Sequence, residues 1–217
     1  KDSVLSIGFV GNDVFVGRVA GWLDSYLIQD EHFERRLHTK VLPYSDYGIS
    51  TILSHNDVFW IGTKNGVFVL NNTGEVVESY TNNPLNPRSL NDEIILSLLI
   101  DNRGNTWVGT ESTGISFLNN KSKQLGHINK HSYLNAPLSH DDVRGFTLDN
   151  LNRLWINTSR GIYIYFEDGF RKAEALYPEL IFLKETFITK VLIDNTHIWI
   201  TTLGQGVVHF NVESNEL

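Results

Sequence analysis

The amino-acid sequence predicts an all-β fold, a β-propeller built of four-stranded antiparallel blades. One pattern recurs five times along the 217 residues, with aromatic anchors separated by 45, 47, 48 and 44 residues. Each copy reads as short apolar strands joined by polar turns, and no stretch shows a sustained helical period. Four short strands in a unit of about 45 residues are typical of propeller blades.

Each copy is centred on an aromatic anchor in its second predicted strand. The anchors are Phe15, Trp60, Trp107, Trp155 and Trp199. A threonine stands three positions after each anchor, except in the first copy, and a glycine stands six or seven positions after it. The glycine predicts a tight hairpin with a positive φ angle. We expect the anchors to fill the seams between neighbouring sheets, where burial of an indole contributes up to about 5 kcal/mol.

The repeats divide the chain into five predicted blades, with approximate bounds at 1–47, 48–91, 92–140, 141–185 and 186–217. The last copy lacks a convincing fourth strand. We therefore expect these blades to form part of a larger propeller, as an open or partial ring. A solenoid is the main rival fold, but β-helix rungs and leucine-rich repeats are shorter than these units.

Composition excludes several classes of partner. The chain has 25 acidic and 18 basic residues, so its formal net charge is −7, and it has no basic cluster. We expect no nucleic-acid binding and no direct membrane contact. There is no cysteine and no long apolar run, which excludes disulfides, thiolate metal sites and a membrane-spanning helix. His127 and His131 have a helical spacing in a region that reads as strand, so we expect no metal site and no cofactor.

The candidate ligand-binding residues lie before the first strands and after the anchor strands, which should meet at one mouth of a propeller channel. They are Arg88, Glu93, Glu111, Arg144 and Arg160. Mixed charges and amides suit a carbohydrate, another small polar ligand or a partner domain. The same surface would suit a protein-binding scaffold.

A carbohydrate-active propeller enzyme, a glycoside hydrolase or a lyase, is the alternative from another class. Two carboxyls about 5–10 Å apart at the mouth could cleave a glycosidic bond. Hydrolysis also requires one carboxyl to be held protonated. The carboxyls at Asp92-Glu93 and Asp141-Asp142 are adjacent pairs in polar links, which favours ionised groups. We therefore assign no catalytic residue and expect no enzymatic activity in this segment.

The third copy resembles the repeat of the two-component regulator propeller family. The residues that carry the resemblance are Pro87, Ser89, Leu90, Asp101, Gly104, Trp107, Val108, Gly109, Thr110 and Gly114. The fourth copy matches through Leu138, Ser139, Asp149, Trp155, Ile156, Thr158 and Gly161. Asn157 replaces a glycine of the pattern, and Arg18 replaces the threonine in the first copy, which departs most from it.

This resemblance implies a function that the residues alone do not. It implies a periplasmic ligand-sensing module, the extracytoplasmic part of an inner-membrane receptor such as a two-component sensor histidine kinase or a diguanylate cyclase receptor. The implied partners are the remaining propeller and the membrane-proximal domains of that receptor, which is expected to be a homodimer.

Overall fold

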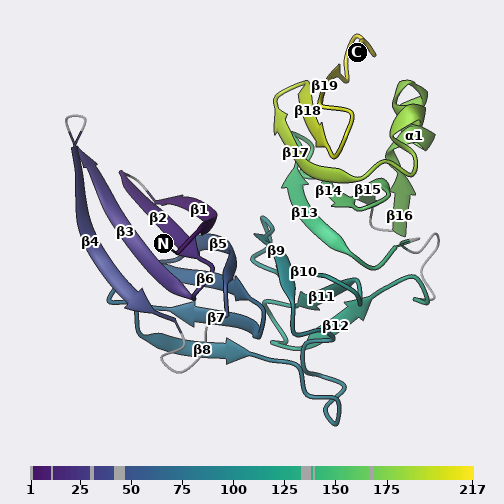
Figure 1. The fold of residues 1–217 in the computed structure, drawn as a ribbon. Coiled ribbons are helices and arrows are strands. Elements are labelled where there is room, and N and C mark those ends of the chain that lie inside the picture. The colour runs from purple at the N-terminus through teal and green to yellow at the C-terminus, as the bar shows by residue number, and fades with distance from the viewer. Residues whose placement is uncertain are drawn as a thin grey trace. The chain divides into compact units, whose positions relative to one another are not determined.

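The computed structural model describes residues 2–10, 12–29, 32–41, 47–132, 138, 140–166 and 169–217. Nearly all of its regular structure is β-strand, arranged in five sheets (Figure 1). The predicted β-propeller fold is confirmed, with five blades that are mostly four-stranded and antiparallel. The chain divides into two compact units, residues 1–98 and 99–217, and the division falls within β9 (Ile95–Ile100).

In each blade the strands pair in sequence order. The first sheet contains β1 (Val4–Val10), β2 (Asp13–Arg18), β3 (Trp22–Gln29) and β4 (His32–Lys40). The second contains β5 (Ile49–His55), β6 (Val58–Thr63), β7 (Gly66–Leu70) and β8 (Val76–Tyr80). The third contains β9, β10 (Thr106–Thr110), β11 (Ile115–Leu118) and β12 (Leu125–Ile128).

The last two sheets belong to the second unit. The fourth contains β13 (Val143–Leu148), β14 (Leu154–Thr158), β15 (Gly161–Phe166) and β16 (Gly169–Lys172). The fifth contains three strands among the described residues: β17 (Ile188–Asp194), β18 (His197–Thr202) and β19 (Val207–Asn211). This three-stranded sheet agrees with the weak fourth-strand signal in the last repeat. Ser139, one of the residues that carry the family resemblance, lies outside the described residues.

The hydrophobic core lies in the seams between successive blades. One buried cluster joins Phe15 of the first blade to Ile61 of the second, and another joins Trp107 of the third to Ile156 of the fourth. A third joins Trp155 to residues of the fifth blade. Because each seam takes side chains from two sheets, a blade completes its core only against its neighbour.

The five anchors differ in how fully they are covered. Phe15, Trp107 and Trp155 are buried, and Trp60 is half-buried. Trp199 is 43% exposed and packs against His209, with ring centroids 4.2 Å apart. Packing in a seam therefore stays a prediction for Trp199.

The recurring threonine closes the hairpin that follows the anchor strand. Its hydroxyl donates to the carbonyl oxygen of the recurring glycine in four blades. These bonds run from Thr63 to Gly66 (3.0 Å), Thr110 to Gly114 (2.8 Å), Thr158 to Gly161 (3.1 Å) and Thr202 to Gly206 (3.0 Å). The hydroxyl also accepts a backbone N–H from within the turn, as from Asn65 and Arg160. The threonine is thus a local side-chain cap of the hairpin.

The first blade replaces this cap with an ion cluster. Arg18 Nε donates to Asp24 Oδ2 at 2.6 Å, and His38 Nδ1 lies 2.6 Å from Asp24 Oδ1. Burial raises the pKa of the Asp24 carboxyl. The hydrogen bonds from Arg18 and His38 together lower that pKa by more than burial raises it, so it lies below its usual value. Arg18 therefore has a structural partner that the repeat pattern does not reveal.

In the second, third and fourth blades the recurring glycine connects the blade to the next, and we call this contact the interblade latch. Its N–H donates to the carbonyl oxygen two residues before the next blade's first strand. The bonds run from Gly66 to Glu93 (2.8 Å), from Gly114 to Asp141 (2.7 Å) and from Gly161 to Thr186 (3.1 Å). The latch places each hairpin turn beside the start of the following blade.

The hairpin turn and the end of the last strand in the same blade explain why the latch donor is glycine. Gly66, Gly114 and Gly161 have φ angles of +104°, +87° and +99°, as the hairpin prediction requires. A Cβ on Gly114 would lie 2.3 Å from the carbonyl oxygen of Ile128, a backbone atom that cannot move aside. Both the φ angle and the close approach exclude a side chain here.

The unusual Asn157 of the fourth blade is accommodated by an exchange across the sheet. In the first and second blades Gly17 and Gly62 pair with Ser6 and Thr51, and a Cβ on either glycine would contact the next blade. In the fourth blade Asn157 pairs with Gly145 instead. A Cβ on Gly145 would lie 2.3 Å from Asn157 Oδ1. In this blade the glycine therefore stands on the first strand instead of the second, and its missing side chain leaves space for the Asn157 amide.

A second recurring device stabilises the anchors at the other end of the strands. In the Asp101 and Asp149 turns, one carboxylate oxygen of the aspartate accepts two backbone N–H groups. The donors are the residues two and four positions after the aspartate. The other accepts the indole N–H of Trp107 at 3.0 Å or Trp155 at 2.9 Å. Both oxygens of each carboxylate therefore serve the turn and the anchor.

Hydrogen bonding shifts both carboxyls in the same direction. Burial raises the pKa of Asp101 and Asp149, but bonds from the indoles and from the turn lower it more. For Asp149 the bonds from Arg153 add to the effect. The net result is a pKa below the usual value, so the ionised form stabilises the fold.

Two short helices lie between the fourth and fifth blades, in a region where the sequence shows no sustained helical period. A short helix α1 (Ala173–Leu176) and a 3₁₀ helix (Pro178–Leu183) follow β16. Ala173, Leu180 and Leu183 join the core of that seam. Each helix is too short to produce a recognisable helical period in the sequence. Both are stabilised by burying apolar side chains in the seam.

The close approach of the Ile128 carbonyl oxygen to Gly114 predicts an unequal cost for two glycine substitutions. Gly114→Ala should reduce the free energy of unfolding by more than about 3 kcal/mol, because it adds a backbone clash to the φ strain. Gly204→Ala has a φ of +99° but nothing within 4 Å of its Cβ, so it should cost only about 1–2 kcal/mol. Urea unfolding of both variants measures the difference, and equal costs would contradict the close approach at Gly114.

The Asp149 turn predicts acid sensitivity. A lowered folded-state pKa contributes stability that is fully present above the unfolded value of about 3.9 and is lost as pH falls through the folded pKa. Asp149→Asn cannot accept all these donors and should destabilise by about 2 kcal/mol at pH 7. It should also flatten the loss of stability below pH of about 4. The exposed Asp194→Asn is the control, and identical acid profiles for wild type and Asp149→Asn would refute the assignment.

Candidate functional site

The end of each sheet that bears the latch carries the sequence-predicted site residues, and we call it the start edge. It is formed by the beginning of the first strand and the hairpin after the second. In the fourth and fifth blades three segments meet there, residues 140–144, 158–161 and 185–187. The latch from Gly161 to Thr186 holds the second segment beside the third.

Two ion-paired groups occupy this start edge. Arg160 Nη1 lies 3.6 Å from Glu185 Oε2, and His140 Nε2 lies 4.0 Å from the same oxygen. Arg144 Nε lies 3.2 Å from Asp142 Oδ2. These five side chains define the Arg160 cluster.

Neutral groups complete the cluster. The Ser159 hydroxyl donates to Asp142 Oδ1 at 2.7 Å. The Arg144 guanidinium lies over the Phe187 ring, with Cζ 4.3 Å from its centroid. Gln205 of the fifth blade donates its amide to Thr186 Oγ1 at 3.4 Å. Guanidinium, carboxylate, hydroxyl, amide and aromatic groups are therefore available on one surface.

Glu185 has an unusual backbone conformation. Its φ angle is +65°, a left-handed value that is uncommon for a residue other than glycine, asparagine or aspartate. It directly precedes Thr186, whose carbonyl oxygen accepts the latch bond. The left-handed turn directs the chain into β17 while the Glu185 carboxylate stays exposed near Arg160.

The structure brings two of the five predicted ligand-binding residues into this cluster, Arg144 and Arg160. Glu111 is exposed at the corresponding hairpin one blade earlier. Arg88 and Glu93 are exposed in the first unit, where the carbonyl oxygen of Glu93 accepts a latch bond. Convergence of all five on one site stays a prediction. Sequence reasoning missed His140, which has no repeat signal of its own.

The adjacent carboxylates at this edge have separate partners. Asp141 accepts the backbone N–H of Lys130 and lies 3.3 Å from its Nζ, whereas Asp142 faces Arg144. Both are half-buried. The carboxylates that the sequence places in polar links are therefore half-buried and paired with basic side chains. Within the described part of the chain, no three His, Asp or Glu side chains are placed to share a metal ion.

The opposite ends of two successive seams contain pockets of the second unit, which we call seam pockets. The first has a volume of about 510 Å³ and lies between the Asp101 turn and the fourth blade. The second, of about 340 Å³, lies one blade further along, between the Asp149 turn and the fifth blade. Equivalent positions in successive repeats show that the blade geometry itself creates these spaces.

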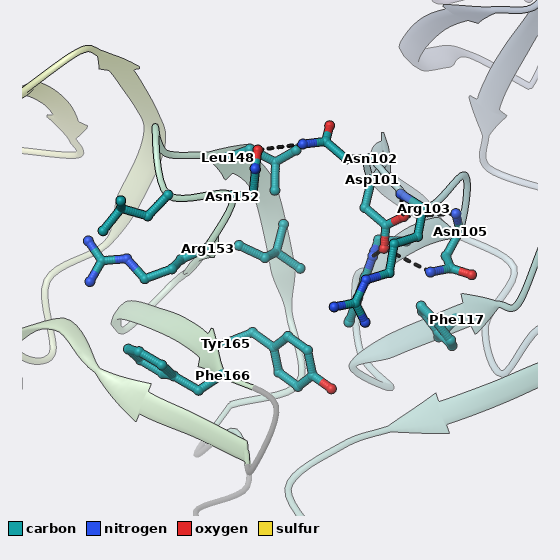
Figure 2. A pocket seen from close by; sticks show the side chains of 13 residues that line it. Asp101, Asn102, Arg103, Asn105, Phe117, Leu148, Asn152, Arg153, Tyr165 and Phe166 are labelled. Atoms are coloured by element: carbon teal, nitrogen blue, oxygen red, sulfur yellow. Dashed lines mark hydrogen bonds between the residues drawn. The ribbon is translucent and has the colours of Figure 1, made fainter.

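The first seam pocket has an aromatic side and a polar side (Figure 2). Phe117, Tyr165 and Phe166 line one side. Leu148 and an amide bridge, in which Asn102 Nδ2 donates to Asn152 Oδ1, line the other. The Arg103 side chain extends into the space between them.

Among solved structures, the chain is similar to the extracellular domain of a hybrid two-component system from B. thetaiotaomicron, with 18% identity and a TM-score of 0.61 over 98% of this chain and 34% of that chain. It is similar to the Pan2 WD40 domain of Neurospora crassa, with 11% identity and a TM-score of 0.69 over 99% and 64%. It is also similar to an inactive virginiamycin B lyase from Staphylococcus aureus, with 15% identity and a TM-score of 0.64 over 97% and 70%.

These likenesses establish the propeller fold, and the chain spans about a third of the first of these proteins. No curated protein matches the chain. No helix in the described ranges has the length and apolar character needed to cross a membrane.

Residues 89–112 match the family described as "Two component regulator propeller". The match includes the anchor Trp107, the cap Thr110 and the Asp101 turn, which are the residues that carried the resemblance in the sequence. The match to the two-component regulator propeller repeat therefore falls on the first two strands of the third blade and the link before them.

Proposed function

We propose that this chain is a ligand-sensing module of a bacterial two-component receptor. The observation that carries the proposal is the two-component regulator propeller repeat at residues 89–112. The propeller fold, shared with the extracellular domain of a hybrid two-component system, supports it. The module lies in the periplasm, and the signalling enzyme, a kinase or a cyclase, resides elsewhere in the receptor.

The start edge is the proposed recognition surface. Arg144 and Arg160 lie there, and Arg88, Glu93 and Glu111 contribute from the equivalent links and hairpins. Side chains from separate segments are held by backbone latches, so they are positioned before a ligand arrives. A mixture of charged, hydroxyl, amide and aromatic groups suits a carbohydrate or another small polar ligand.

Signalling requires that the ligand distinguish two states of the receptor. A ligand shifts such an equilibrium only by its difference in affinity for the two states. We propose that the module contacts the remaining propeller and the membrane-proximal domains, and that the receptor is a homodimer whose geometry responds to binding. A scaffold propeller that binds only a protein partner is a second possibility for the same surface.

The proposal includes no catalysis by this chain. A hydrolytic carboxyl acid needs a raised pKa. The carboxyls with resolved shifts, Asp24, Asp101 and Asp149, all have lowered pKa values. At the start edge Asp142 and Glu185 are paired with guanidinium groups. These groups support recognition better than glycoside hydrolysis or lyase chemistry.

Substitutions in the Arg160 cluster test the proposal. Against a panel of neutral and acidic oligosaccharides, Arg160→Ala and Arg144→Ala should weaken binding at least tenfold, about 1.4 kcal/mol. The melting temperature should change little, because Arg160 is exposed. Arg171→Ala, on β16 of the same blade, is the matched control. Titration calorimetry and thermal melts measure both effects.

Two results would contradict this proposal. Binding that survives both arginine substitutions would remove the start edge as the recognition surface. Turnover of any oligosaccharide that is abolished by Glu185→Gln or Glu93→Gln would establish the enzymatic alternative.

A further inference from the structure

The latch of the second blade contains a residue pair that the other latches lack. Its donor, Gly66, directly follows Asn65, and this is the only asparagine–glycine pair in the 217 residues. The residues that precede the latch donors of the third and fourth blades are Thr113 and Arg160, which have no side-chain amide. The second latch therefore combines the backbone hydrogen bond of this fold with a sequence that can rearrange chemically.

The chemistry of the pair depends on the missing side chain of the glycine. The backbone nitrogen of Gly66 can attack the side-chain amide carbon Cγ of Asn65, because no Cβ on the glycine blocks the approach. A C–N bond forms, and the proton from the attacking nitrogen leaves with the side-chain amide group as ammonia. The product is a five-membered succinimide ring. Water then opens the ring at either of its two carbonyl carbons and leaves aspartate or isoaspartate, so no oxidant or metal is required.

In the folded protein the attacking nitrogen is already engaged. The Gly66 N–H donates to the carbonyl oxygen of Glu93 at 2.8 Å, so the proton that must be lost is held in the latch. The hairpin around it is closed by the buried Thr63. The Thr63 hydroxyl donates to the carbonyl oxygen of Gly66 at 3.0 Å and accepts the Asn65 N–H at 3.0 Å. The reaction therefore has to wait until the latch opens.

The isoaspartate product does not fit the same turn. Isoaspartate carries the main chain through its Cβ and Cγ, which adds one atom to the backbone between residues 65 and 66. Gly66 has no space to absorb this shift. Its φ angle is +104°, and a Cβ on it would lie 2.2 Å from the carbonyl oxygen of Tyr80. The lengthened turn therefore moves the Gly66 nitrogen away from its acceptor, and it carries an additional negative charge.

We propose that Asn65 is a deamidation site whose reaction is controlled by the latch of the second blade and whose product breaks that latch. Opening of the latch frees the Gly66 nitrogen, and the succinimide forms. The resulting isoaspartate separates the hairpin from the link that contains Glu93. The modification accumulates with the age of the molecule. It does not depend on the proposed sensor function, because it involves only this hairpin and its latch.

A comparison of folded and unfolded protein tests the control by the latch. In mildly alkaline buffer, peptide mapping by mass spectrometry measures the conversion of Asn65. We expect conversion in the folded chain to be at least about tenfold slower than in denaturing urea, because only locally opened molecules react. At urea concentrations below the unfolding transition, the rate should rise in proportion to hydrogen exchange of the Gly66 N–H, since one opening permits both.

Two matched variants separate opening of this hairpin from general loss of stability. Thr63→Val removes the hydroxyl that closes the hairpin and should speed conversion of Asn65 about fivefold, the effect expected for the loss of one hydrogen bond. Thr110→Val makes the same change in the third blade and should leave the rate at Asn65 unchanged. Asn65→Gln should show no conversion at this position on the same time scale.

The isolated isoaspartate form tests the consequence of the reaction. Its additional negative charge allows separation from the unmodified chain by ion exchange. In this form the Gly66 N–H should exchange as fast as an amide in an exposed turn, whereas the latch amides of Gly114 and Gly161 should keep their protection.

Three results would overturn the proposal. Equal rates of conversion in folded and urea-unfolded protein would show that the latch does not control the reaction. Equal effects of Thr63→Val and Thr110→Val would show that general destabilisation, rather than this hairpin, sets the rate. A Gly66 N–H that stays protected in the isoaspartate form would show that the product keeps the latch.

Discussion

The interblade latch is the contact on which the rest of this structure depends. A backbone N–H in the hairpin of one blade donates to a carbonyl oxygen just before the first strand of the next. The donor must be glycine, because the hairpin has a positive φ and, at Gly66 and Gly114, a carbonyl oxygen lies where a Cβ would stand. One residue type therefore fixes the turn, the spacing of the blades and the entry of the following strand.

The Arg160 cluster is a direct consequence of this contact. Gly161 is bonded to Thr186, so its neighbour Arg160 lies near Glu185, which precedes Thr186. The preceding Ser159 donates to Asp142 at the start of the same blade. Both contacts join short segments that the latch already holds together, so no additional loop is needed to position them. Repetition of the latch would place polar side chains at every start edge, and variation of those side chains would set specificity without disturbing the core.

The two ends of a seam have different physical characters. At the start edge, backbone hydrogen bonds hold successive blades together. At the other end the Asp–Trp turns satisfy their own polar groups, and the next blade approaches without a comparable backbone bond among the described residues. Space remains there, and it takes the form of the seam pockets.

Much of the fold could be predicted because it is encoded by a local pattern that repeats. The five repeats, their aromatic anchors and the mostly four-stranded antiparallel blades were predictable in this way. The positive φ angles of the recurring glycines were also predictable from the hairpin signal. Such features depend on residues close together in the sequence, so five copies reinforce one another.

The rest depends on partners that the sequence does not place. Gly145 compensates for Asn157 only because the two are cross-strand neighbours. Asp24 stabilises Arg18 only because β3 brings it beside the first hairpin. At the candidate site, Arg144 and Arg160 were predictable from their links and hairpins, but their pairing with Asp142 and Glu185 was not. Those contacts are set by the latch geometry rather than by a motif.

Hydrogen exchange of the latch amides tests the central claim most directly. The N–H groups of Gly114 and Gly161 lie in hairpin turns, where exchange is fast unless a hydrogen bond protects it. We predict that both exchange as slowly as amides in the adjoining strands, because each donates to the next blade. Exchange as fast as in exposed turns would show that the latch does not connect the blades, and would contradict this account.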